Sequence, residues 1–134
     1  MAVHPFLSFN GNCREAMSFY QSCFGGELKL KYLGDSPDGE QMPQDMKELI
    51  LHASLLSKHV QLFASDLGVE EGLSAGNRIS LLFNTSHNRE LLSAFKKLSK
   101  GAEITNPVSG NILNGEWATL TDRYMVQWIF CVKK

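Results

Sequence analysis

A few polar side chains occur where they could bind a small molecule or a metal ion. His52 lies in the middle of the apolar run 49–56, whose alternating side chains predict a strand. A histidine in such a place is either a hydrogen-bonded core residue or a ligand for a metal or an organic molecule. His4, Arg78 and Gln127 are further polar residues that lie in or beside other apolar runs.

Two other chemical motifs have simpler interpretations. Gly72-Leu73-Ser74-Ala75-Gly76 matches the G-x-S-x-G nucleophile elbow, which requires a strand before the serine and a helix after it. Here a loop precedes the serine and a strand follows, so we interpret the run as a flexible linker. Cys13, Cys23 and Cys131 form no C-x-x-C pair, so we expect reduced thiols and no cysteine metal site.

The elements that must position these residues follow an internal repeat. Each half begins with an apolar strand, continues through a turn and an amphipathic helix that ends at glycine, and adds three strands. The predicted strands are 5–9, 27–32, 49–56 and 60–65 in the first half and 79–83, 102–105, 116–121 and 126–132 in the second. Asn12 fits the N-cap of the first helix, with Glu15 three positions on. The prediction is an α+β fold of two βαβββ modules.

The module boundaries follow from the same pattern. We expect module 1 at about 1–65, a linker at 66–76 and module 2 at about 77–134, together forming one domain. The segment 34–47, rich in glycine, proline and charge, should be a loop outside the sheets, near a cavity mouth or an interface.

Alternation divides each predicted strand into two faces. One face is almost entirely apolar and should be covered by the helices: Leu7, Phe9, Leu49, Leu51, Ala53, Leu55, Ile79, Leu81, Phe83, Val126, Trp128 and Phe130. The other face mixes polar and apolar residues: His4, Phe6, Ser8, Ile50, His52, Ser54, Arg78, Ser80, Leu82, Gln127, Ile129 and Cys131. Such a mixture suits a ligand cavity enclosed by curved mixed sheets, with the helices on the outer face.

At this level the chain resembles the vicinal-oxygen-chelate superfamily of glyoxalases, bleomycin-resistance proteins and extradiol dioxygenases. Within it, the opening Pro5-Phe6-Leu7-Ser8-Phe9-Asn10-Gly11-Asn12-Cys13-Arg14-Glu15-Ala16 resembles the PhnB-like branch. The runs His52-Ala53-Ser54-Leu55, Leu62-Phe63-Ala64-Ser65-Asp66 and Thr121-Asp122-Arg123-Tyr124 are similar to that branch too. The resemblance covers nearly the whole chain.

The resemblance implies positions for a site. Superfamily enzymes hold a divalent metal on the first and last strands of each module, which correspond here to His4, His52, Arg78 and Gln127. Arg78 cannot bind a metal because its guanidinium stays protonated, so the implied set is His4, His52 and Gln127, with Zn, Mn, Ni or Fe as the ion. The implied ligand-binding residues are Phe6, Ser8, His52, Ser54, Arg78, Trp117 and Gln127. The resemblance also implies a homodimer.

Composition limits the function classes. The chain has 134 residues, 43% hydrophobic, and a net charge of −1, values that fit a globular domain and show no nucleic-acid footprint. No apolar run reaches the ~20 residues of a membrane span and no signal peptide is visible, so we expect a cytoplasmic protein. Within these limits, the family resemblance implies two alternative functions. The first is a small-molecule-binding protein acting as a metal-dependent enzyme on a substrate with vicinal oxygens, with no catalytic residue assigned. The alternative is a metal-free dimeric protein that binds or sequesters a ligand.

Overall fold

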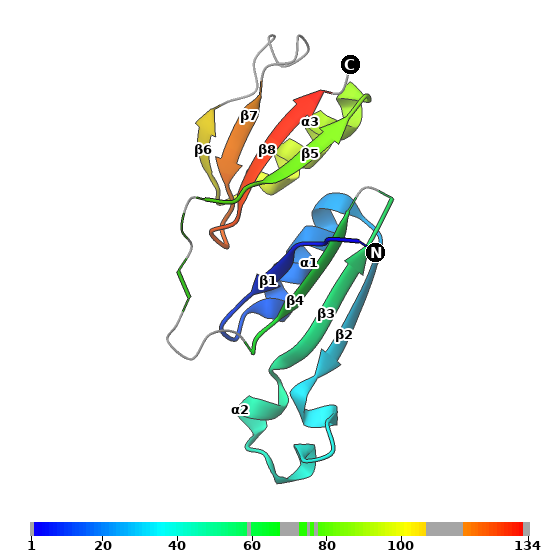
Figure 1. Ribbon diagram of the computed structural model, residues 1–134, viewed down its shortest axis with the longest axis vertical. Helices are drawn as coiled ribbons and strands as arrows, with labels where there is room; N and C mark the ends of the chain where they lie inside the picture. Colours follow the sequence, from blue (N-terminus) through cyan, green and yellow to red (C-terminus); the bar gives the residue numbers. More distant parts are fainter. Residues whose placement is uncertain are drawn as a thin grey trace. The chain divides into compact units, whose positions relative to one another are not determined.

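The computed structural model describes residues 2–58, 60–67, 73–74, 76, 78–106 and 117–132. The chain divides into two compact units, Met1–Ser74 and Ala75–Lys134 (Figure 1). No helix of the described residues is long and apolar enough to span a membrane.

The first unit is a four-stranded sheet with one helix across it. Its strands are β1 (Phe6–Ser8), β2 (Glu27–Tyr32), β3 (Ile50–Leu56) and β4 (Gln61–Ser65), in the order β1-β4-β3-β2. β1 runs parallel to β4, and the other pairs are antiparallel. Helix α1 (Cys13–Phe24) covers one face of the sheet, and no helix among the described residues of the unit lies on the other face (Figure 1).

The second unit repeats this plan. β5 (Leu81–Thr85), β6 (Glu103–Asn106), β7 (Ala118–Thr121) and β8 (Gln127–Val132) form a sheet in the order β5-β8-β7-β6, and α3 (Asn88–Leu98) packs on one face. The predicted α+β fold of two βαβββ modules is therefore confirmed. The matching strand order, with the first strand parallel to the last, is what an internal repeat requires.

The cores lie between each helix and its sheet. In the first unit, Ala53 and Leu55 of β3 are fully buried, as are Met17 and Tyr20 of α1. In the second, the Phe130 ring lies 5.2 Å from Phe95 of α3 in an edge-to-face arrangement and 5.7 Å from Phe83 of β5. These apolar strand faces need a helix stripe to exclude water from them.

Two residues depart from the predicted faces. Ile50 was assigned to the mixed face of its strand, but it is fully buried. The cause is a bulge: Lys31 pairs with His52 while the next residue, Tyr32, pairs with Ile50, so one residue of β3 is left unpaired. A one-residue shift reverses the face of every side chain beyond it.

The other departure is at the start of β5. The predicted strand 79–83 is observed at Leu81–Thr85, so Arg78 and Ser80 precede it. Ile79, assigned to the core face, is 79% exposed because it lies outside the ladder.

The segment between β2 and β3 forms no strand, as predicted. It folds into two 3₁₀ turns, Leu33–Asp35 and Gly39–Gln41, and the short helix α2 (Gln44–Lys47). The turns touch backbone to backbone, since a Cβ at Gly39 would lie 1.7 Å from the carbonyl oxygen of Gly34. Only glycine permits that approach.

The N-terminus of α1 is capped from a distance. Asn12 is the N-cap residue, as predicted, but its side chain makes no capping hydrogen bond. Asp66 Oδ1 instead accepts from the backbone N–H groups of Gly11 and Cys13, both at 2.9 Å, and its Oδ2 accepts from the N–H of Ile50 at 2.8 Å. Asp66, the first residue of the predicted linker, is thus hydrogen-bonded to the turn before α1 and to β3.

Candidate functional site

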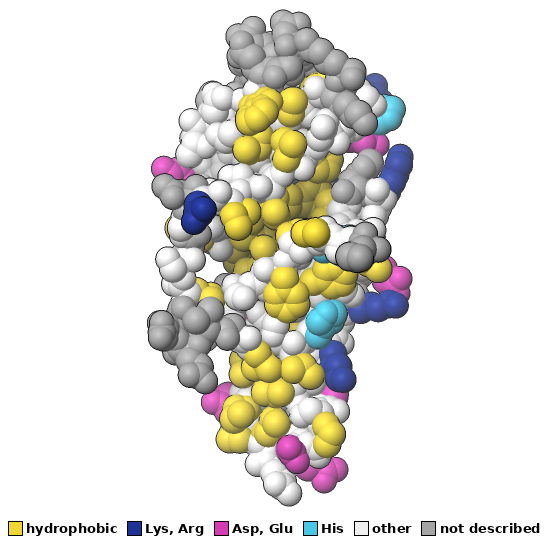
Figure 2. All heavy atoms as spheres, in the orientation of Figure 1, with side chains coloured by type: hydrophobic (Ala, Val, Ile, Leu, Met, Phe, Trp, Pro, Cys, Tyr) yellow, Lys and Arg dark blue, Asp and Glu magenta, His cyan; other side chains and the backbone are white. Residues whose placement is uncertain are grey.

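The open face of the first sheet, meaning the face opposite α1, gathers apolar, aromatic and basic side chains. Residues that pair across strands share a face, so the strand register shows which residues lie on the open face. The open-face residues are Phe6 and Ser8 on β1, Gln61, Phe63 and Ser65 on β4, His52, Ser54 and Leu56 on β3, and Glu27, Lys29 and Lys31 on β2. Hydrophobic, histidine and basic side chains lie together on this face (Figure 2).

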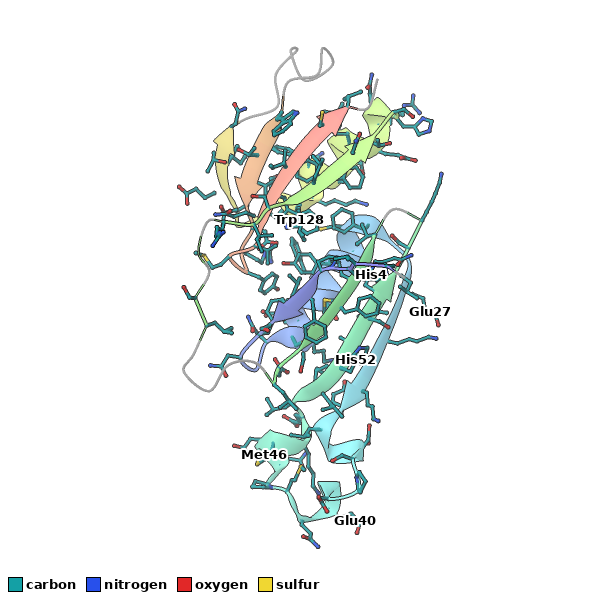
Figure 3. All side chains as sticks on the ribbon, viewed as in Figure 1. His4, Glu27, Glu40, Met46, His52 and Trp128 are labelled. Carbon is teal, nitrogen blue, oxygen red and sulfur yellow. The ribbon has the colours of Figure 1, made fainter. Side chains whose placement is uncertain are left out.

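Four rings form a cluster on this face. Phe63 is central, with its ring centroid 5.5 Å from His4 and 6.0 Å from His52. Phe6 lies 6.4 Å from His52 and is 56% exposed. His4 precedes β1, but the backbone N–H of Phe63 donates to the carbonyl of Pro5, so the chain beside His4 still follows β4 (Figure 3). Exposed rings at these separations offer a surface on which a flat molecule can stack.

Ser54 lies near the middle of the face. It pairs with Lys29 on β2 and with Phe63 on β4, and it is only 9% exposed. Its hydroxyl makes no side-chain hydrogen bond to any residue that the structure describes. Every buried side-chain nitrogen or oxygen of the described residues has a hydrogen-bond partner, so the Ser54 hydroxyl is reached by solvent and is available to a ligand.

The open face of the second sheet is more apolar. Leu82 is 54% exposed and Trp117, next to β7, is 52% exposed. Gln127 begins β8, but both ends of its amide are engaged: Oε1 accepts from Ser80 Oγ at 3.3 Å and Nε2 donates to the Gly76 carbonyl at 3.4 Å. Gln127 therefore fastens the segment before β5 to β8.

The candidate residues fall in different units. Phe6, Ser8, His52 and Ser54 share the open face of the first sheet, with His4 beside them. Gln127 and Trp117 belong to the second unit, as does Arg78, which is exposed and outside any strand. The predicted cavity that joins His52 to Gln127 stays a prediction.

The predicted metal ligands are His4, His52 and Gln127, and they lie in two different units. His4 and His52 both flank Phe63, so the first unit brings these two imidazoles to one face. Among the described residues, no group of three or more His, Cys, Asp or Glu side chains could hold an ion. The Gln127 amide is hydrogen-bonded within the second unit. The three-residue metal set of His4, His52 and Gln127 stays a prediction.

The buried thiol beside the Asp66 cap is not a nucleophile. Burial, together with the nearby carboxylate of Asp66, raises the pKa of Cys13 from 9.0 to about 12. The thiolate is the reactive form of cysteine, so this thiol is inert near neutral pH.

Sequence reasoning missed Phe63, Lys29 and Lys31. The signal was present, because Glu27-Leu28-Lys29-Leu30-Lys31-Tyr32 alternates and places the lysines opposite the leucines that face α1. Likewise Phe63 alternates with the buried Leu62 and Ala64. Only the register with β3 shows that these three side chains share a face with His52 and Ser54.

Comparisons with known proteins agree with the fold. A family model described as 3-demethylubiquinone-9 3-methyltransferase matches residues 1–131. Protein YjdN of Escherichia coli is 26% identical over 100% of this chain and 97% of its own length.

Solved structures give the same picture. Protein PA1353 of Pseudomonas aeruginosa is 31% identical, with a TM-score of 0.83 over 99% of this chain and 98% of that one. A PhnB protein of Bacillus cereus is 22% identical, with a TM-score of 0.75 over 99% and 100%. The fosfomycin resistance protein FosX of Listeria monocytogenes is 12% identical, with a TM-score of 0.62 over 100% and 93%, and shares the fold alone.

Proposed function

Because this chain belongs to the PhnB-like family, whose model is described as 3-demethylubiquinone-9 3-methyltransferase, we propose that it binds a small organic molecule on the open face of its first sheet. The observation that carries the proposal is the ring cluster of Phe6, His52 and Phe63, with His4 beside it. Exposed aromatic rings on a sheet face gain free energy when a ligand covers them. A few polar groups among them would orient that ligand.

Methyl transfer, which the family description names, has little support in the chain itself. Nucleotide cofactors usually bind where a strand passes through a glycine-rich turn into a helix. The turn between β1 and α1, residues 9–12, contains one glycine, Gly11. It is also occupied by the Asp66 carboxylate, which already accepts the N–H groups at the start of α1.

The test is binding of small planar probes, followed by NMR. Indole, benzyl alcohol and benzoate are titrated separately into the protein, and we expect at least one of them to shift the resonances of His52 and Phe63. Phe6→Ala should weaken that binding about threefold or more, since stacking area is lost. Leu92→Ala, which removes an exposed leucine of α3, is the matched control and should bind like the parent. If no probe at millimolar concentration affects this face of the folded protein, the proposal is wrong.

A metal-dependent enzyme acting on vicinal oxygens is the competing proposal. In its favour, His4 and His52 lie on one face. A FosX variant of Listeria monocytogenes was solved with Mn(II) and 1S,2S-dihydroxypropylphosphonic acid, but at 12% identity that likeness extends only to the fold. Titration of the metal-free protein with Zn, Mn, Ni or Fe ions, alongside His52→Ala, separates the two proposals. Micromolar or tighter binding that His52→Ala abolishes would favour the enzyme.

A further inference from the structure

The chemical class of the ligand follows from the register of the first sheet. Lys29 stands opposite Ser54, and Ser54 stands opposite Phe63, which in turn stands opposite Phe6. Lys31 stands opposite His52. Directly opposed side chains on one face lie about 4.5–5.5 Å apart at Cβ, so a continuous row runs from a cationic edge to an aromatic edge.

The charge on this face is one-sided. None of the open-face residues on β1, β3 and β4 is acidic, and Glu27 at the end of β2 is the one carboxylate among those assigned to the face. Glu27 Oε1 lies 3.9 Å from Lys29 Nζ, but the two side chains are 70% and 68% exposed. Ion pairs this exposed contribute little binding free energy, so Glu27 hardly neutralises Lys29. Lys31 makes no ion pair within the described ranges. The row therefore attracts anions.

Ser54 supplies the second, independent feature. Its hydroxyl lies between Lys29 and Phe63, on a residue that is nine-tenths buried, and it has no side-chain partner among the residues described. No buried side-chain oxygen of the described residues lacks a partner, so this hydroxyl is reached by solvent, and its hydrogen bond to a ligand would replace one to water. An acceptor such as a carboxylate or phosphate oxygen would fit between this hydroxyl and the lysines.

We infer that the first sheet binds a planar molecule that carries an anionic group, with the ring on Phe6 and Phe63 and the anion at Ser54, Lys29 and Lys31. This inference rests on the proposed function and specifies its ligand. The lysines attract and hold the charge, Ser54 donates a hydrogen bond to it, and the phenylalanines hold the ring.

The experiment compares four probes by NMR titration at low ionic strength: benzoate, phenyl phosphate, benzyl alcohol and inorganic phosphate. Benzoate or phenyl phosphate should bind roughly tenfold more tightly than benzyl alcohol, because a charge-assisted hydrogen bond is added. Which of the two binds more tightly identifies the anion as carboxylate or phosphate.

The variants then locate the anion. Lys31→Gln and Ser54→Ala should each weaken the binding of the anionic probe about threefold or more. Neither variant should change the binding of benzyl alcohol. Lys97→Gln, an exposed lysine on α3, removes the same charge elsewhere and should have no effect. Lys29→Gln is a second edge variant, in case Ser54→Ala perturbs the sheet.

The outcomes separate this inference from the proposal beneath it. Equal binding of benzyl alcohol and benzoate would overturn the anionic class and leave a ligand-binding face. Inorganic phosphate binding as tightly as phenyl phosphate would overturn the role of the ring. Failure of all four probes would overturn the proposed function as well.

Discussion

At the scale of single residues, Asp66 links three parts of the first unit. Its two oxygens accept three backbone N–H groups from the turn before α1, the first residue of α1 and the start of β3. Gly11 and Cys13, which precede Asp66 by 55 and 53 positions, are thereby held at the end of β4. No local pattern could reveal this cap, because its partners are remote in sequence.

We predict that Asp66→Asn lowers the free energy of unfolding by about 2 kcal/mol, because the amide presents an N–H to at least one buried backbone N–H. Urea denaturation measures the change. Asp38→Asn, on an exposed aspartate whose side chain makes no cap, should be nearly neutral. Equal effects from the two substitutions would contradict this role.

The thiols should differ in reactivity. Cys13 is fully buried with its pKa raised to about 12, whereas Cys131 is half-buried on the open face of the second sheet. We predict that a disulfide reagent at pH 8 labels Cys131 first and labels Cys13 only on unfolding. Time-resolved labelling with peptide mass spectrometry measures this. Cys131→Ser should remove the fast phase, and fast labelling of Cys13 in the folded protein would contradict the prediction.

The raised pKa of Cys13 also makes the stability of the folded protein depend on pH. The folded state keeps the Cys13 thiol protonated. Its contribution to the free energy of unfolding is therefore fully present below about pH 9, which is the ordinary pKa of the thiol. That contribution is lost as the pH rises from about 9 towards 12, since the unfolded chain then ionises more readily.

At the scale of elements, the turn between β7 and β8 supports the end of α3. The Arg123 guanidinium donates to the carbonyl oxygen of Lys100 from Nε at 3.0 Å and Nη2 at 2.8 Å. Lys100 follows α3, and Gly101 then turns the chain at a positive φ of 75° towards β6. Arg123 thus adds two side-chain hydrogen bonds just beyond a helix end whose last carbonyls already accept from Ser99 and Lys100.

We predict that Arg123→Ala lowers the free energy of unfolding by about 1 kcal/mol, a value discounted because the side chain is exposed. Arg123→Lys should recover less than half of this, because an ammonium lacks the planar fork that donates twice. Arg89→Ala, on an exposed arginine of α3, is the control. Guanidinium chloride denaturation measures all three, and full rescue by lysine would contradict the role of the fork.

At the scale of the whole molecule, each of the two sheets has one face on which no helix lies, within the described part of its own unit. Exposed apolar side chains on those faces include Phe6, Leu56 and Leu82. A second copy of the chain could cover part of this surface, and homo-oligomers are most often two-fold symmetric.

We therefore retain the prediction of a homodimer. Light scattering at micromolar concentration should give about twice the 15.0 kDa of the chain. Phe6→Ser should shift the mass towards the monomer if this face is in the interface, while Leu92→Ser on α3 should not. A monodisperse mass near 15.0 kDa for the unaltered protein would exclude the dimer.

The sequence by itself determined the order of the elements and most of their faces. Alternation and helical spacing depend on neighbours one to four residues apart, so β3, α1 and β8 were predictable to within a few residues. The repeat of the strand order was also readable, since it is written twice in the chain.

Only the tertiary structure decided which side chains share the open face of the first sheet. The bulge in β3 sent Ile50 into the core, and the cross-strand register brought Phe63, Lys29 and Lys31 to the side of His52. The amide of Gln127, a predicted metal ligand, is hydrogen-bonded to Ser80 and to the carbonyl of Gly76. Each of these outcomes depends on which residues lie opposite each other across strands, and that pairing joins positions far apart in the chain.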